Sequence, residues 1–175
     1  MEQLTRGLHW LLVGVLLKLV CSALALNYPG FLRLGLLSAI PTALGLLSCA
    51  RGPVAGWRAA LALVGPVSEV ASAVTLGDSR TNFEDVCAGG EILGYGLLLL
   101  YLISLASAIL RRDLVRQGWF SLLVPPGAMF LCALNYNSYD VKSRFLSLLL
   151  VAVWAALAWY IRRLQTALKK APVEW

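Results

Sequence analysis

Six apolar stretches, each about 18 to 20 residues long, constrain this chain more than any other feature of its sequence. An α-helix rises about 1.5 Å per residue, so about 20 apolar residues cross the hydrocarbon core of a bilayer. The approximate bounds of these stretches are residues 8–26, 32–50, 57–76, 91–110, 118–135 and 144–161. Only 14% of the 175 residues are charged, whereas a soluble domain has about 25%. The sequence therefore predicts an all-α, polytopic membrane protein, a single transmembrane domain of about six helices in the lipid bilayer.

The placement of Lys and Arg predicts the orientation of this bundle, because cytoplasmic flanks of membrane helices retain basic residues. One set of connections and termini carries Arg6, Arg51, Arg58, Arg111, Arg112, Arg116, Arg162, Arg163, Lys169 and Lys170. The opposite set carries Arg33, Arg80, Lys142 and Arg144. Both termini are therefore predicted to be cytoplasmic, and the compact loops favour the inner (plasma) membrane of a bacterium. This topology explains the net charge of +6, so no nucleic-acid partner is expected.

Two charges, Lys18 and Glu69, lie inside the predicted membrane spans. Lys18 lies about 10 residues and Glu69 about 12 residues from the cytoplasmic ends of their spans, so both fall near the middle of the bilayer. A lone charge at that depth costs on the order of 3 kcal/mol, and such residues therefore face the protein interior and find partners. We expect Lys18 and Glu69 to pair with each other.

Small and polar residues share the helix faces of these two charges, which predicts close helix packing around them. Span two, with Ser38 and Thr42, is expected to form the third wall. Pro66 and Pro41 are expected to kink spans three and two, and Pro125 with Pro126 span five. The candidate ion or solute pathway comprises Lys18, Glu69, Ser22, Ser68, Ser72 and Glu91.

Other chemistries find little support in the sequence. One His and four Cys without a metal-ligand spacing predict no metal site, no cofactor and no catalytic triad. The acidic loop before span four contains Thr81 and Glu84, which fit a helix-capping box with the helix starting at Asn82. A disulfide from Cys87 to Cys21 or Cys132, and a cleaved signal peptide ending near residue 25, are the less favoured alternatives.

Two functions agree with these features. The first is a small, non-enzymatic membrane protein of the transporter or channel type, which handles a proton, ion or small solute near Lys18 and Glu69 and forms a homo-oligomer to enclose a pathway. The alternative is an accessory or scaffold subunit of a larger membrane complex, in which the pair only fixes the helix register. An intramembrane enzyme acting on lipid is a third and weaker hypothesis.

Overall fold

The described part of the chain in this computed structural model is helical apart from short turns. It comprises residues 2–25, 36–52, 54, 56–75, 81–121, 123 and 139–170. The helices are α1 (Glu2–Ala25), α2 (Ala39–Ala50), α3 (Gly56–Leu61), α4 (Val64–Thr75), α5 (Thr81–Ala108) and α7 (Tyr139–Lys170), and residues 112–121 are also helical. The predicted all-α class is confirmed for these residues.

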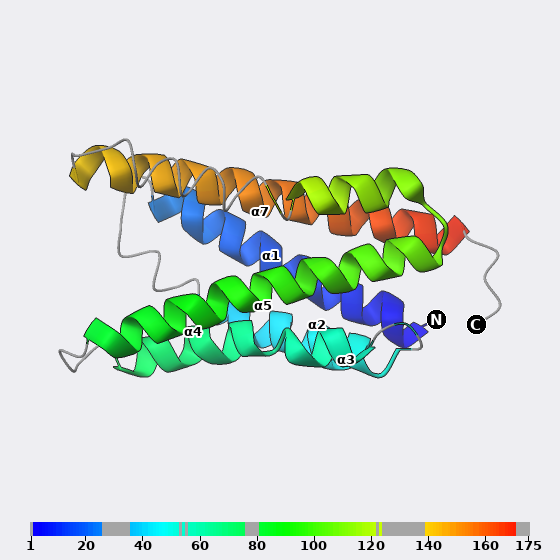
Figure 1. The fold of residues 1–175 in the computed structure, drawn as a ribbon, viewed down its shortest axis with the longest axis horizontal. Helices are drawn as coiled ribbons and strands as arrows, with labels where there is room; N and C mark the ends of the chain where they lie inside the picture. Colours follow the sequence, from blue (N-terminus) through cyan, green and yellow to red (C-terminus); the bar gives the residue numbers. More distant parts are fainter. Residues whose placement is uncertain are drawn as a thin grey trace.

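Successive helices run in alternating directions along the long axis of the molecule, except that α4 continues in the same direction as α3 (Figure 1). The start of α1 and the end of α7 lie at the same end of the bundle, together with the turn between α5 and residues 112–121. Helix α1 packs against α2 and α7, α4 packs against α5, and α3 lies between α2 and α5. This order agrees with an up-and-down helix bundle in which the first helix begins and the last helix ends on the same side.

Three helical segments are long and apolar enough to cross a membrane: Glu2–Leu24, Gly89–Ala108 and Leu148–Lys170. They correspond to the first, fourth and sixth predicted spans, although α1, α5 and α7 each extend beyond the predicted bounds. The apolar helix Leu36–Ala50 covers part of the second span and is shorter. The remaining spans, and with them the total of six, stay predictions.

The third predicted span, residues 57–76, consists of two helices rather than one kinked helix. Helix α3 ends at Leu61 and α4 begins at Val64. Pro66 has no N–H to donate to the carbonyl of Ala62, and its ring disfavours a regular helix there. The N–H of Gly65 instead donates to the Ala62 carbonyl at 3.1 Å. The predicted distortion at Pro66 is therefore present, and it lies one turn before the proline.

Pro41 was expected to kink span two, but the structure gives it another role. It lies in the first turn of α2, directly after a 3₁₀ turn at residues 36–38. Backbone N–H groups in the first turn of a helix have no intrahelical acceptor, so a proline there removes no hydrogen bond. Pro41 thus lies just after the point where the 3₁₀ turn passes into α2, and not in the middle of a long α-helix.

Several sequence predictions lie outside the described residues. These are the distortion at Pro125 and Pro126, the cysteines Cys87 and Cys132 as disulfide partners, and the side chains of the Thr81 and Glu84 capping box. The backbone of α5 begins at Thr81, one residue before the predicted start at Asn82, and it continues without a break to Ala108. Cys21 and Cys49, the cysteines that the structure does describe, are free thiols.

The turn after α5 contains the one described residue other than glycine with a positive φ, Leu110, at 56°. The Leu110 N–H donates to the Ser107 carbonyl at 2.9 Å and the Arg111 N–H to the Ala106 carbonyl at 3.1 Å. This pair of bonds is a Schellman motif, whose left-handed position is usually Gly. The Leu110 side chain is 87% exposed, so packing within the bundle does not explain the choice of leucine.

Leu110→Gly is expected to stabilise the protein in detergent by about 1 kcal/mol, because glycine adopts a left-handed conformation without the steric cost that a Cβ brings. The measurement is an SDS unfolding titration of the variant beside the wild type. A variant less stable than the wild type would show that the leucine side chain contributes packing that outweighs its backbone strain.

Candidate functional site

The structure brings Lys18 and Glu69 together as the sequence predicts. Lys18 Nζ of α1 lies 2.8 Å from Glu69 Oε2 of α4, and their side chains are 18% and 13% exposed. Glu69 follows Pro66 by one helical turn, so the break before α4 sets the start of the helix that carries it. The pair is thus a direct ion pair inside the bundle.

Helix α2 contributes a third group to this ion pair. Ser38, which is fully buried, donates its hydroxyl hydrogen to Glu69 Oε1 at 3.4 Å. Thr42, one turn further along α2, donates to the Ser38 carbonyl at 2.7 Å. A carboxylate in a low-dielectric interior gains from each such donor. The expectation that span two forms the third wall around the pair therefore agrees with the structure.

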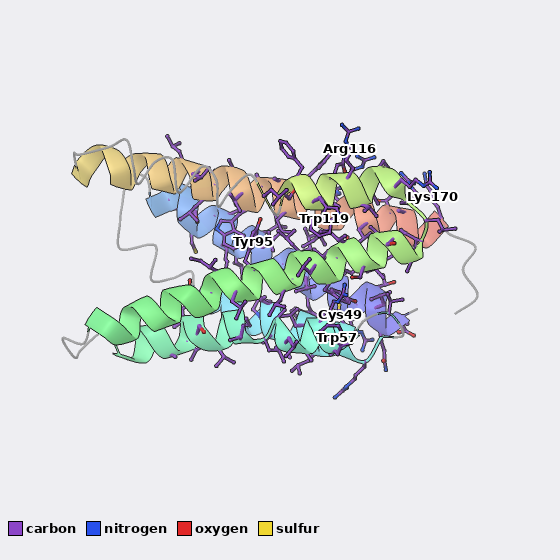
Figure 2. All side chains as sticks on the ribbon, viewed as in Figure 1. Cys49, Trp57, Tyr95, Arg116, Trp119 and Lys170 are labelled. Atoms are coloured by element: carbon purple, nitrogen blue, oxygen red, sulfur yellow. The ribbon has the colours of Figure 1, made fainter. Side chains whose placement is uncertain are left out.

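The ammonium group of Lys18 also contacts an aromatic ring. Its Nζ lies 5.0 Å from the ring centroid of Trp154 on α7, within the range of a cation–π interaction. Tyr95 of α5 packs edge-on against the same Trp154 ring at 5.7 Å between centroids, and its hydroxyl donates to the Ser121 carbonyl at 3.4 Å. Figure 2 shows Tyr95 in the middle of the bundle. The site thus draws on α1, α2, α4, α5 and α7.

A cavity of about 40 Å³ lies beside the ion pair. Its polar lining comprises Lys18, Thr42, Glu91 and Tyr95, and its remaining walls include Gly65, Gly94 and Trp154. A water molecule needs about 10–15 Å³ of such volume and two or more polar partners. The cavity is therefore large enough for a few water molecules.

Glu91 is the third charged group at this site. Its carboxyl lies close enough to interact electrostatically with both the Lys18 ammonium and the Glu69 carboxylate. Within the described part of the chain it makes no hydrogen bond and no ion pair, and it lines the cavity that Lys18 also lines. With all three groups ionised, the site carries one more negative than positive charge.

The predicted serines occupy different positions around the site. Ser22 is buried on α1, one turn beyond Lys18. Ser68 lies at the contact between α4 and α5, where a Cβ added to Gly90 would collide with its hydroxyl. Ser72 lies in α4, and its side chain is outside the described part of the structure. The structure thus places Ser68 next to α5 and Glu91.

Sequence reasoning missed Trp154 and Tyr95 and treated Ser38 only as part of a wall. One signal in the sequence points to Trp154, because it lies in the middle of its predicted span, whereas tryptophans of an interfacial belt lie near the ends. A tryptophan at that depth needs another reason for its position, and contact with Lys18 supplies it.

Comparison with known proteins gives no relative for this chain: no family model, no curated protein and no solved structure matches it. Functional inference therefore rests on the geometry and charge of the site.

Proposed function

We propose that the chain is a multi-pass membrane protein of the transporter or channel type, which binds a proton or small monovalent cation at the site formed by Lys18, Glu69 and Glu91. In this proposal six spans cross the inner membrane of a bacterium, both termini are cytoplasmic, and copies of the chain associate to complete the pathway. The proposed function involves no enzymatic step and no cofactor.

One observation supports the proposal: two carboxyl groups share one ammonium group, and one of these carboxyl groups, that of Glu91, lines a cavity with the ammonium group. Lys18 and Glu69 neutralise each other at 2.8 Å, while Glu91 lines the cavity without a hydrogen bond or ion pair to any described residue. An uncompensated carboxylate inside a membrane is costly, so it favours uptake of a proton or a cation. Binding that neutralises Glu91 and release that restores its charge are the two steps that transport requires.

The experiment is ion flux into vesicles that contain the purified chain. A pH-sensitive dye reports protons, and Na⁺- and K⁺-sensitive dyes report cations, under an imposed gradient. We expect Glu91→Gln to reduce the flux at least tenfold, because the amide has nearly the same shape and cannot take up a proton or carry a charge. Glu2→Gln is the matched control, since Glu2 lies at the start of α1, 90% exposed and far along the chain from the cavity.

The outcomes separate clearly. Flux in the wild type and in Glu2→Gln, with little in Glu91→Gln, supports the proposal. Equal flux in all three proteins shows that ions pass by a route without Glu91, which overturns the proposed site. Wild-type vesicles that conduct protons, Na⁺ and K⁺ no faster than protein-free vesicles overturn the transport function itself.

A second candidate is an accessory subunit of a larger membrane complex, and the completeness of the ion pair favours it. Glu69 has Lys18 and Ser38 as partners, and Lys18 has Glu69 and Trp154. Such a satisfied pair suits a fixed structural role. An accessory subunit should tolerate replacement of both charges by apolar residues, whereas a transporter that depends on them should fold and lose its flux.

A further inference from the structure

Helical residues 112–121 carry two arginines, Arg112 and Arg116, at the end of the bundle that holds the start of α1 and the end of α7. Arg112 and Arg116 are exposed, one turn apart, and neither forms an ion pair or hydrogen bond with any residue that the structure describes. Like charges four residues apart destabilise a helix. An anion bound between these side chains would remove that repulsion.

Two neighbouring basic residues, Arg111 and Arg163, bind other side chains. Arg111 donates two hydrogen bonds of 2.9 Å to Asp113, and these bonds hold the pKa of the Asp113 carboxyl near 2. Arg163 of α7 contacts the same carboxylate at 3.3 Å and donates to Gln117 at 3.1 Å. Asp113 is thus ionised at neutral pH and paired with Arg111 and Arg163, and it forms no ion pair with Arg112 or Arg116.

Two hollows meet at Arg116 and Trp119, and their linings differ. The first, of about 680 Å³, lies at the corner after α5 and is lined by Ser107, Leu110, Arg111, Arg112, Val115, Arg116 and Trp119. The second, of about 690 Å³, is lined by Asp113, Arg116, Gln117, Trp119, Phe120, Ser121, Leu123, Ala156, Trp159 and Tyr160, and most of its surface is apolar. Arg116 and Trp119 line both hollows. Figure 2 shows Arg116 and Lys170 in the same half of the molecule.

The order of basic and apolar residues along this helix is complementary to a lipid, which has a charged head group and an apolar chain. Basic side chains come first, at positions 112 and 116, an indole follows at 119, and apolar side chains at 120 and 123 lead into the predicted fifth span. Phe120 and Leu123 are each 68% exposed, as expected for groups that contact lipid chains. Leu110, strained and exposed at the mouth of the basic hollow, adds an apolar side chain beside the arginines.

From this arrangement we infer that the two adjoining hollows bind an anionic phospholipid, with its phosphate between Arg112 and Arg116 and an acyl chain along Trp119, Phe120 and Leu123. The charge of the pair is complementary to the phosphate, and the apolar hollow is complementary to the chain. Basic pockets between membrane helices on the cytoplasmic side bind acidic head groups in this way. The inference does not depend on ion transport and goes beyond the proposed function.

The test is native mass spectrometry of the whole chain in a neutral detergent, with phosphatidylglycerol or phosphatidylcholine added. We expect the wild type to retain phosphatidylglycerol preferentially. The double variant Arg112→Gln with Arg116→Gln should weaken that binding about tenfold or more. Each basic group near an anionic head group raises the binding affinity about fivefold. Lys169→Gln with Lys170→Gln is the matched control, because it removes the same charge from exposed residues at the end of α7.

Loss of preferential binding in the arginine variant alone supports the site. An equal loss in both double variants would show only general attraction between a basic surface and an anionic lipid, and it would overturn the inference, as would unchanged binding in the arginine variant. Displacement of the lipid by millimolar inorganic phosphate would identify a soluble anion as the ligand and would also overturn it.

Discussion

Lys18→Met is expected to destabilise the protein by about 3–5 kcal/mol, the usual cost of removing one partner of a buried ion pair. The substitution keeps the length of the side chain and removes its charge. Glu69 keeps the Ser38 hydroxyl, at 3.4 Å, as a hydrogen-bond donor. The variant loses the charge–charge attraction of the 2.8 Å ion pair inside the bundle, and this loss costs free energy on folding.

An SDS unfolding titration of the purified protein measures this loss. Lys169→Met is the control for removal of a lysine, because Lys169 is exposed in the last turn of α7. Exposed substitutions usually change stability by less than about 0.5 kcal/mol. If Lys18→Met were no less stable than this control, Glu69 would be compensated by other groups and the ion pair would not support the fold.

The double variant Lys18→Met with Glu69→Leu decides between the two candidate functions. Apolar replacement of a whole buried ion pair is often neutral or stabilising, so we expect the double variant to regain most of the lost stability. If it then also lost ion flux while remaining folded, the pair would have a role in transport. If flux and stability both returned to wild-type values, the pair would be structural.

The ion pair and the three helices that are long and apolar enough to cross a membrane could be predicted, because each follows from one strong physical rule. Long apolar runs must be helical in lipid, where every backbone polar group needs an internal partner. Lys18 and Glu69 had to find partners at similar depth in the membrane. Neither rule depends on knowledge of which helices are neighbours.

Features that depend on the order of helices around the bundle could not be predicted in the same way. The small-residue face of α4 was expected to pack within the first three spans, yet Gly65 and Ser68 contact Gly94 and Gly90 of α5. The same neighbour relation brings Glu91 to the cavity. A face of small residues predicts close packing without specifying the partner, so the third charge of the site needed the structure.

The break in the third span was predicted only in outline. Pro66 indicates a distortion, but a proline can kink a continuous helix or end one. Here the chain makes a turn at Ala62 and Leu63 and starts a new helix at Val64. The left-handed Leu110 gave no signal at all, because leucine is among the residues that least favour this conformation.

Gly94→Ala is expected to be the second strongly destabilising change, at about 1–3 kcal/mol from overpacking. A Cβ at Gly94 would collide with the Cα and N atoms of Gly65 and lie 3.2 Å from the Ala62 carbonyl oxygen. These are backbone atoms of the helix break, so no side-chain rotation can relieve the contact. Helix α4 would have to move away from α5 and carry Glu69 with it.

Gly96→Ala is the matched control, on the same helix and two residues away. A Cβ at Gly96 meets no atom within 4 Å, and alanine is the better helix former by about 1 kcal/mol. We therefore expect the two variants to differ by about 2–4 kcal/mol in an SDS titration. Equal stability would mean that α4 and α5 separate without cost. Since Gly65 and Gly94 both line the cavity, a folded Gly94→Ala protein should also have altered ion flux, which would connect this helix contact to the site that it encloses.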